Sequence, residues 1–207
     1  EKQSTYKLTD KPTSGIYQSD EFLRTYNKGK KISNLGTTII IGGGNVAIDS
    51  ARTAKRMGSE NVYILYRRNK ELMPASEEEL NQALNDGVKI IFQTKVISAE
   101  VQNSKIQNIE CIKTKIEDQK AVDIENSNYK MEANTIVFAI GAKANDNLLS
   151  NQGIETEYGL CKVDDKNMTN IKGVYAGGDL IQTKSSVARA VAAGKKAAEA
   201  ILEEGNE

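Results

Sequence analysis

A glycine-rich turn between a buried strand and a helix constrains this chain more than any other feature. Residues 37–41 form a β-branched run that is too short for a helix and too apolar for an exposed strand. The run is followed at once by Gly42-Gly43-Gly44-Asn45-Val46-Ala47, which fits the pattern G-x-G-x-x-A. Apolar residues then recur at helical spacing from Val46 to Met57, and Gly58 ends the helix. This order predicts the start of a parallel βαβ unit.

The following residues extend the same alternation of strands and helices. We expect a second strand at 62–66, a helix that begins at a capping box formed by Ser76 and Glu79, and a third strand at 88–92. Short alternating stretches between Lys95 and Glu132 predict an antiparallel meander. A last apolar run, 135–140, returns to the parallel sheet. The predicted fold is α/β, a Rossmann-like parallel sheet with an antiparallel meander.

Both ends of the chain differ from this middle part. Residues 1–33 are polar and offer only a short helix near 21–26, so we interpret them as a lead-in segment. Residues 142–172 are polar and loop-like, and a short strand is expected at 173–176. A helix from about Ser186 to Leu202 carries a stripe of small and apolar residues that permits close packing, namely Ala190, Ala193, Gly194, Ala197, Ala198 and Ile201.

Composition excludes several classes of function. The 207 residues include 28 Lys and Arg, 28 Asp and Glu, and no His, so the formal net charge is zero. A neutral chain gives no reason to expect nucleic acid as a partner, and a chain without histidine excludes Ser-His-Asp hydrolysis and His-ligated zinc. Cys111 and Cys161 lie too far apart for a CxxC dithiol and are too few for an iron-sulfur cluster, so we expect no metal site. Without an apolar run of membrane-spanning length or a signal peptide, we expect a cytoplasmic protein that does not enter a membrane.

The glycine turn predicts a dinucleotide site. Gly42 permits the tight turn, Gly44 lets the backbone approach a pyrophosphate, and Ala47 lets the helix pack on the strand. The free amides near Asn45 and Val46 then face the anion at the positive end of the helix. The alternative is a glycine-rich turn that holds no ligand.

The end of the second strand favours NADP over NAD. An NAD site usually has an acidic residue there for the ribose 2′-hydroxyl, but this strand ends Tyr66-Arg67-Arg68 and the next carboxylate is Glu71. Paired guanidinium groups suit a 2′-phosphate, which an acid would repel. The alternative is that both arginines are solvated charges at a strand end. Asp49 is expected in the first helical turn as an acid that stabilises the helix dipole, without a catalytic role.

A second glycine motif follows the expected strand at 173–176. Gly177-Gly178-Asp179 could place a carboxylate at a ribose or ribityl hydroxyl, with the helix that begins at Ser186 aimed at a polarised oxygen. An ordinary β-turn is an equally good interpretation of these residues.

Four motifs in order resemble the carboxyl-terminal part of the glutamate synthase small (beta) subunit. The related dihydropyrimidine dehydrogenase and ferredoxin:NADP oxidoreductase flavoproteins share the pattern, and the resemblance runs from about Gly15 to Ile201. The motifs are specific for this superfamily and do not select one member. They are residues 41–49, Tyr66-Arg67-Arg68 with Met73-Pro74-Ala75, Ala139-Ile140-Gly141, and residues 174–179.

The resemblance implies an NADPH domain, residues 34–141, inserted between two parts of an FAD domain, residues 1–33 and 142–207. Hydride would pass from NADPH to FAD, with no catalytic side chain required. Gly42 to Val46, including Gly43, would hold the pyrophosphate, and Arg67 with Arg68 the 2′-phosphate. Ala139, Ile140 and Gly141 would line the nicotinamide side where the domains meet. In the FAD domain the implied residues are Gly178 and Asp179 at the ribityl chain, and Ser186 and Val187 at the isoalloxazine carbonyl.

The chain also departs from the family pattern. It lacks the earlier GxGxxG for the FAD adenosine and the upstream cysteine clusters for iron-sulfur centres. We therefore expect a piece of a longer protein that binds NADPH and holds FAD weakly or not at all. The implied partners are the missing FAD-domain half and an iron-sulfur or glutaminase/synthase subunit, and we expect the two flanks to pack together and to expose apolar surface that favours self-association.

Two other functions remain open, and a third does not fit the sequence. One is a noncatalytic module that kept the dinucleotide pocket and regulates another activity. Another is a thioredoxin-reductase-like flavoprotein, which would lack the dithiol here. A self-sufficient short-chain dehydrogenase would need a Tyr-x-x-x-Lys pair on a helix, and none of the three occurrences in the sequence, Tyr26–Lys30, Tyr66–Lys70 and Tyr158–Lys162, lies on an expected helix.

Overall fold

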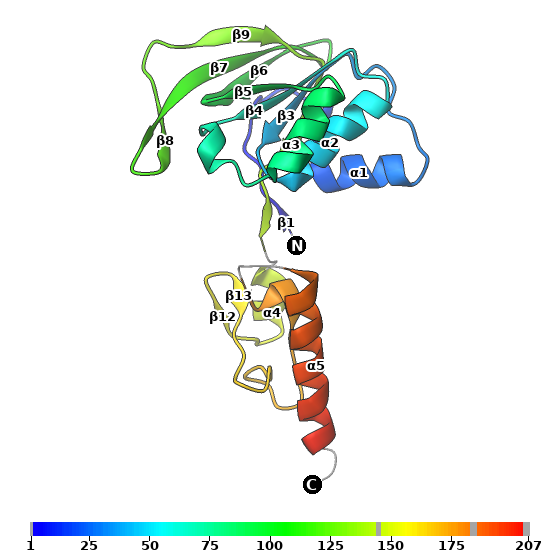
Figure 1. Ribbon diagram of the computed structural model, residues 1–207, viewed down its shortest axis with the longest axis vertical. Helices are drawn as coiled ribbons and strands as arrows, with labels where there is room; N and C mark the ends of the chain where they lie inside the picture. Colours follow the sequence, from blue (N-terminus) through cyan, green and yellow to red (C-terminus); the bar gives the residue numbers. More distant parts are fainter. Residues whose placement is uncertain (1, 144–145, 183–185, 205–207) are drawn as a thin grey trace. The chain divides into compact units, whose positions relative to one another are not determined.

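A computed structural model describes residues 2–143, 146–182 and 186–204 (Figure 1). The chain divides into two compact units. The larger is Gln3–Gly141, and the smaller consists of Glu1–Lys2 with Ala142–Glu207. Two short strands pair with each other, β1 (Lys2–Gln3) and β11 (Ala142–Lys143). Both lie where the chain passes from one unit to the other.

The larger unit is built on a five-stranded parallel sheet with the order β2-β10-β3-β4-β5. The order places β3 and β10 side by side in the middle of the sheet, and Ala139 pairs with Gly42 at their carboxyl ends. All six residues of β3 and all five of β10 are buried, as expected for central strands of a parallel sheet. The strands are β2 (Ile16–Gln18), β3 (Thr37–Gly42), β4 (Asn61–Tyr66), β5 (Lys89–Phe92) and β10 (Thr135–Ala139).

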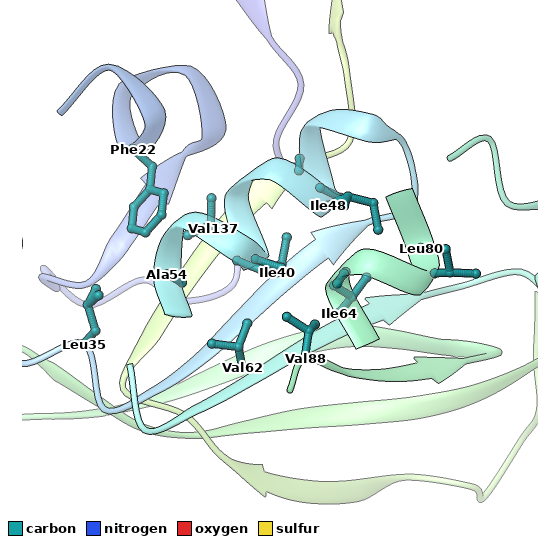
Figure 2. Close-up of a cluster of buried hydrophobic side chains, with 14 residues drawn as sticks. Phe22, Leu35, Ile40, Ile48, Ala54, Val62, Ile64, Leu80, Val88 and Val137 are labelled. Carbon is teal, nitrogen blue, oxygen red and sulfur yellow. The ribbon is translucent and has the colours of Figure 1, made fainter. Parts of the chain in front are cut away.

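Three helices cover one face of this sheet. They are α1 (Ser19–Asn27), α2 (Asn45–Arg56) and α3 (Glu77–Asn85). Figure 2 shows their apolar side chains, among them Phe22, Ile48 and Leu80, gathered over Ile40 and Ile64 of the strands. The βαβ unit predicted from the glycine turn is confirmed, since β3 and β4 pair in parallel on either side of α2 in the sequence.

An antiparallel meander covers the other face. Long strands β6 (Thr94–Gln102) and β7 (Lys105–Glu117) pair with each other, and β8 (Lys120–Asp123) and β9 (Tyr129–Glu132) both pair with β7. Alternate side chains of the meander, such as Val96 and Ile109, pack on Ile39 and Leu65 of the sheet. The meander predicted between Lys95 and Glu132 is confirmed.

The amino-terminal segment contributes more to this unit than the sequence suggested. The expected helix near 21–26 is α1, but β2 precedes it and pairs with β10, where Ile16 lies opposite Ile136. Leu8 and Phe22 belong to the two buried clusters. Residues 3–33 therefore lie in the same compact unit as 34–141, which differs from the expectation that the two flanks pack together. The reason is that β2 satisfies one hydrogen-bonding edge of β10.

The smaller unit has little regular structure apart from its last helix. Residues 142–172 are not all loop, since they contain β11, α4 (Asp146–Asn151), β12 (Thr156–Glu157) and β13 (Leu160–Cys161). The prediction of a strand at 173–176 is wrong, because these residues form only an isolated bridge, between Tyr175 and Met168. A 3-10 turn, η2 (Gly178–Leu180), and helix α5 (Val187–Glu204) follow.

Two details of the expected helices are corrected. Ser76 caps α3, because its Oγ accepts a hydrogen bond from the Glu79 amide at 3.3 Å. The capping box is incomplete, because among the described residues no hydrogen bond joins the Ser76 amide to the Glu79 carboxylate. In α5 only Ala193 and Ala200 are buried, so most of the stripe of small residues, including Ile201, does not pack closely within the part of the chain that the structure describes.

Across these described ranges, every helix is too short or too polar to cross a bilayer.

Candidate functional site

The first glycine of the turn is required by the approach of β3 to β10. Gly42 ends β3 with a φ of +147°, in the region that favours glycine. A Cβ atom there would lie 2.2 Å from the carbonyl oxygen of Ala139. No side chain fits in that space, so the sharp turn and the tight strand pairing depend on the same residue.

The next two glycines meet different surroundings. A Cβ on Gly43 would lie 2.5 Å from the ring of Tyr66, so this glycine packs directly under the aromatic side chain at the end of β4. A Cβ on Gly44 would have no atom within 4 Å. The turn is therefore closed on the side of Tyr66 and open at Gly44, where a bound group could approach the backbone.

The amino end of α2 is free to bind an anion. Gly44 is the N-cap without a side-chain cap, and its carbonyl accepts hydrogen bonds from Ala47 and Ile48 at 2.8 and 3.2 Å. The amides of Asn45 and Val46 have no partner within the described ranges, and both residues are exposed. Asp49 is exposed and does not lie in the first turn as expected, since that turn contains no acid. The positive end of the helix is therefore not neutralised by its own side chains.

The loop after β4 carries the two arginines and is fixed through its backbone. The Thr114 hydroxyl of β7 donates a hydrogen bond to the Arg67 carbonyl at 2.6 Å. The Gln93 amide, between β5 and β6, donates to the Arg68 carbonyl at 3.0 Å. These bonds come from the meander side of the unit, so the meander helps to shape the loop.

The two arginine side chains have different surroundings. Arg67 is exposed, and its charge acts on Tyr6 in the meander-side cluster. The pKa of Tyr6 is raised to about 12, mainly by burial and next by the neighbouring Cys111, while the charge of Arg67 acts to lower it. Arg68 is half-buried, and its Nε is enclosed without a partner among the described residues. Asn69 Oδ1 is likewise enclosed and unpartnered there. Buried polar atoms are normally paired, so these two atoms indicate an incomplete site.

The motif after β10 lies beside the glycine turn. Ala139 is buried and pairs with Gly42, whereas Ile140 is exposed. Gly141 has a φ of +90°, and its carbonyl accepts a hydrogen bond from the Ser4 amide at 2.8 Å. The carboxyl ends of two central strands thus bring Ala139 and Ile140 next to the loop expected to hold the pyrophosphate.

The other four expected site residues form a second group, within the smaller unit. Gly178 has a φ of +67°, and a Cβ on it would lie 3.7 Å from Ala190, so η2 lies against the first part of α5. Asp179 is exposed. Ser186 caps α5 by accepting a hydrogen bond from the Arg189 amide at 3.3 Å, and Val187 is 83% exposed. The structure therefore places Gly178 and Asp179 on a turn that lies against the helix that Ser186 caps and Val187 begins. The ten expected residues of the larger unit lie at or directly after the carboxyl ends of β3, β4 and β10.

Sequence reasoning missed Tyr66, Asn69 and Thr114. The alternation of β4 could have placed Tyr66 on the helix side of the sheet, with Ile64, and so over the glycine turn. No sequence signal identifies Thr114, which lies 47 residues from the carbonyl that it binds.

Comparison with known proteins gives relatives that resemble the chain over most of its length. The beta subunit of NADP(+)-dependent formate dehydrogenase from Moorella thermoacetica is 30% identical over 200 residues, which are 93% of this chain and 28% of that subunit. The glutamate synthase (NADPH) small chain of Escherichia coli K12 is 28% identical over 221 residues, covering 94% of this chain and 46% of the relative. The chain thus spans less than half the length of either relative.

Solved structures show the same fold. Thioredoxin reductase from T. acidophilum has a TM-score of 0.67 at 20% identity, with 83% of this chain and 53% of that chain covered. Thioredoxin reductase from Lactococcus lactis has a TM-score of 0.66 at 24% identity, with 81% and 52% covered.

A family model described as pyridine nucleotide-disulphide oxidoreductase matches residues 8–197, which include both glycine motifs and all five strands of the parallel sheet. This match covers far more than half of the sequence and agrees with the resemblance to the glutamate synthase small subunit. The chain therefore belongs to the pyridine nucleotide-disulphide oxidoreductase family.

Proposed function

We propose that this chain binds NADPH at the glycine turn and is the pyridine-nucleotide part of a flavin oxidoreductase that passes hydride from NADPH to FAD. The observation that carries the proposal is the open space at Gly44 together with the amides of Asn45 and Val46, which find no partner among the residues that the structure describes. A diphosphate needs such donors and close backbone approach. The names of the relatives, one NADP(+)-dependent and one NADPH-dependent, support the choice of nucleotide.

Arg68 is the main candidate to recognise the 2′-phosphate. Its Nε is enclosed and unpartnered within the described ranges, so a phosphate oxygen would satisfy a donor that the fold leaves unused. Arg67 is exposed and adds positive charge nearby. The second strand ends without a carboxylate, so nothing in it repels a phosphate.

The remaining expected residues have positioning roles in this proposal. Ala139, Ile140 and Gly141 would line the nicotinamide side, while Gly178, Asp179, Ser186 and Val187 would contact FAD. The bound cofactors supply the hydride chemistry, and the protein holds them in place and excludes water. The partners would be the FAD-domain half and an iron-sulfur or glutaminase/synthase subunit, in line with the longer relatives.

Titration with NADPH and NADH tests the nucleotide site. Arg68→Ala should weaken NADPH binding about tenfold to a hundredfold, because hydrogen bonds to charged groups contribute about 1.5–3 kcal/mol. Binding of NADH, which lacks the 2′-phosphate, should change little. Arg67→Ala should have a smaller effect in the same direction.

Arg56→Ala is the matched control, since Arg56 is exposed at the opposite end of α2. It should leave both affinities unchanged. Equal loss of NADPH and NADH affinity in Arg68→Ala would contradict recognition of the 2′-phosphate by that residue.

Reconstitution tests the flavin part of the proposal. After incubation with excess FAD and gel filtration, we expect little or no flavin to remain with the 207-residue chain. A diaphorase assay of the longer parent protein should show NADPH-dependent dye reduction. Nucleotide affinity without dye reduction would instead support a noncatalytic regulatory module.

A further inference from the structure

We propose that Tyr66 is a positioning residue that sets the preference for NADPH over NADH. It would do so by holding residues 67–75, the loop that follows β4 and carries Arg67 and Arg68 (the arginine loop), against the glycine turn. The inference rests on the proposed nucleotide site and assigns a role to a side chain that need not touch the cofactor. Tyr66 is the last residue of β4 and is buried. It lies between the glycine turn, which would bind the diphosphate of the ligand, and the arginine loop, which would bind the 2′-phosphate.

The ring of Tyr66 fixes one side of the glycine turn. A Cβ on Gly43 would lie 2.5–3.0 Å from three ring carbons, so the turn and the ring are in direct contact. The middle glycine is thus needed for packing on Tyr66, while its neighbour Gly44 keeps the open approach to the amides. A shift of the ring would therefore shift the turn.

The hydroxyl of Tyr66 fixes the arginine loop. It donates a hydrogen bond to the Leu72 carbonyl at 2.6 Å, which folds the loop back toward the end of β4. The Ala75 amide then donates to the Gly43 carbonyl at 3.1 Å, so the far end of the loop returns to the glycine turn. Tyr66 and this backbone bond together connect the arginine loop to the glycine turn.

The meander fixes the start of the same loop. Thr114 and Gln93 bind the carbonyls of Arg67 and Arg68, so the loop is held at its beginning, near its middle and at its end. Such a frame reduces the conformational freedom that binding would otherwise remove. The frame therefore holds the loop, which includes the 3-10 turn η1 (Lys70–Leu72), in one shape.

The frame presents two unpaired polar atoms of opposite type. Arg68 Nε is a donor and Asn69 Oδ1 an acceptor, and both are enclosed without partners among the described residues. A ribose that carries a 2′-phosphate offers both complements, phosphate oxygens for the donor and a neighbouring hydroxyl for the acceptor. A ligand with this chemistry satisfies both atoms, whereas the hydroxyl of an unphosphorylated ribose offers the Arg68 donor only an uncharged and therefore weaker acceptor.

Tyr66→Phe tests the role of the hydroxyl and keeps the ring on Gly43. We expect the ratio of the NADH Kd to the NADPH Kd to fall about threefold to tenfold, the range for one hydrogen bond between neutral groups. Tyr63→Phe is the matched control, because its hydroxyl lies on the same strand and accepts a bond from Lys89 Nζ at 3.4 Å, away from the loop. The control should keep the wild-type ratio.

Thr114→Val is a second variant, which removes the bond to the Arg67 carbonyl at nearly constant volume. Thr114→Val should also lower the ratio of the NADH Kd to the NADPH Kd. In both variants the affinity for 2′,5′-ADP should fall. A lower melting temperature with an unchanged ratio in both variants would mean a merely structural role and would overturn the inference. If the wild-type chain prefers NADPH, that result leaves the proposed function intact, whereas a wild-type chain that binds neither nucleotide defeats both.

Discussion

The two units of this chain differ in how much apolar surface they bury. The larger unit has a buried cluster on each face of its sheet, one under α1–α3 and one under the meander. In the described part of the smaller unit the buried apolar residues are only Leu149, Cys161, Ala193 and Ala200. Its longest helix, α5, leaves Val187, Val191, Ile201 and Leu202 exposed.

This difference bears on the two groups of candidate site residues. Short segments bury too little surface to offset the conformational entropy lost on folding. The residues proposed for NADPH stand on a sheet that is packed on both faces, so their geometry is set within their own unit. Gly178, Asp179, Ser186 and Val187 stand on a unit with a small core, and we expect their geometry to depend on further protein.

Separating the units should have the largest effect. We expect a fragment of residues 3–141 to unfold cooperatively and to bind NADPH, because both buried clusters and the glycine turn lie within it. A fragment of residues 142–207 should show no cooperative transition. Circular dichroism during heating, with fluorescence titration of NADPH, measures both. Cooperative unfolding of the smaller fragment would contradict the expected difference in stability between the two units.

Substitution of single glycines should separate stability from binding in the larger unit. Gly42→Ala should cost about 3 kcal/mol of unfolding free energy, since it combines strain at positive φ with overpacking against Ala139. Gly44→Ala should change stability by about 0.5 kcal/mol or less, because its φ is −92° and the space around it is open. Urea denaturation measures both values.

The Gly44→Ala variant also tests the proposed nucleotide site. Gly44→Ala should still weaken NADPH binding, because the added methyl group occupies the open space beside the free amides. Full NADPH affinity in a stable Gly44→Ala variant would argue against a diphosphate at this turn.

The reaction rates of the two cysteines allow a direct comparison of the two units, and the expected difference is smaller than in the experiments above. Both are buried free thiols, Cys111 in the larger unit and Cys161 in the smaller. Local opening needs less free energy where few apolar contacts hold a segment, so Cys161 should react with iodoacetamide faster than Cys111 under native conditions. Mass spectrometry of single-cysteine variants gives both rates. Faster modification of Cys111 would reverse the ranking of the two units.

The buried thiol of Cys111 predicts that the stability of the protein depends on pH. Burial raises the pKa of Cys111 from 9.0 to about 12, with a smaller contribution from Glu110. The protonated thiol is favoured in the folded state, so its contribution to stability is complete below pH 9 and is lost as the pH rises toward 12. Cys111→Ala should therefore lessen the fall in the urea midpoint between pH 9 and 11. If the urea midpoint falls equally in wild type and variant, the pH dependence belongs to other groups. Tyr6 is one such group, because its pKa is also raised to about 12, mainly by burial.

Much of the larger unit could be predicted from sequence because its signals are local. The β-branched run at 37–41, the glycines after it and the helical spacing that follows specify a strand, a turn and a helix without distant contacts. Strand β2 could not be predicted in this way, because its three residues form a strand only through pairing with β10, which lies more than 100 residues later in the chain. The strand expected at 173–176 was wrong for the opposite reason, since its apolar residues find only one bridging partner.

Residue types and spacing control turns, helices and strands locally, so the amino-acid sequence alone predicts a parallel sheet with a glycine turn and two arginines at the carboxyl ends of its strands. Which atoms are left to bind a ligand depends on the tertiary structure. Tyr66 covers Gly43, Thr114 reaches the Arg67 carbonyl, and Arg68 Nε is enclosed without a partner among the described residues. Each of these facts depends on packing between segments that are distant in the chain, and packing selects the polar groups that stay unpaired.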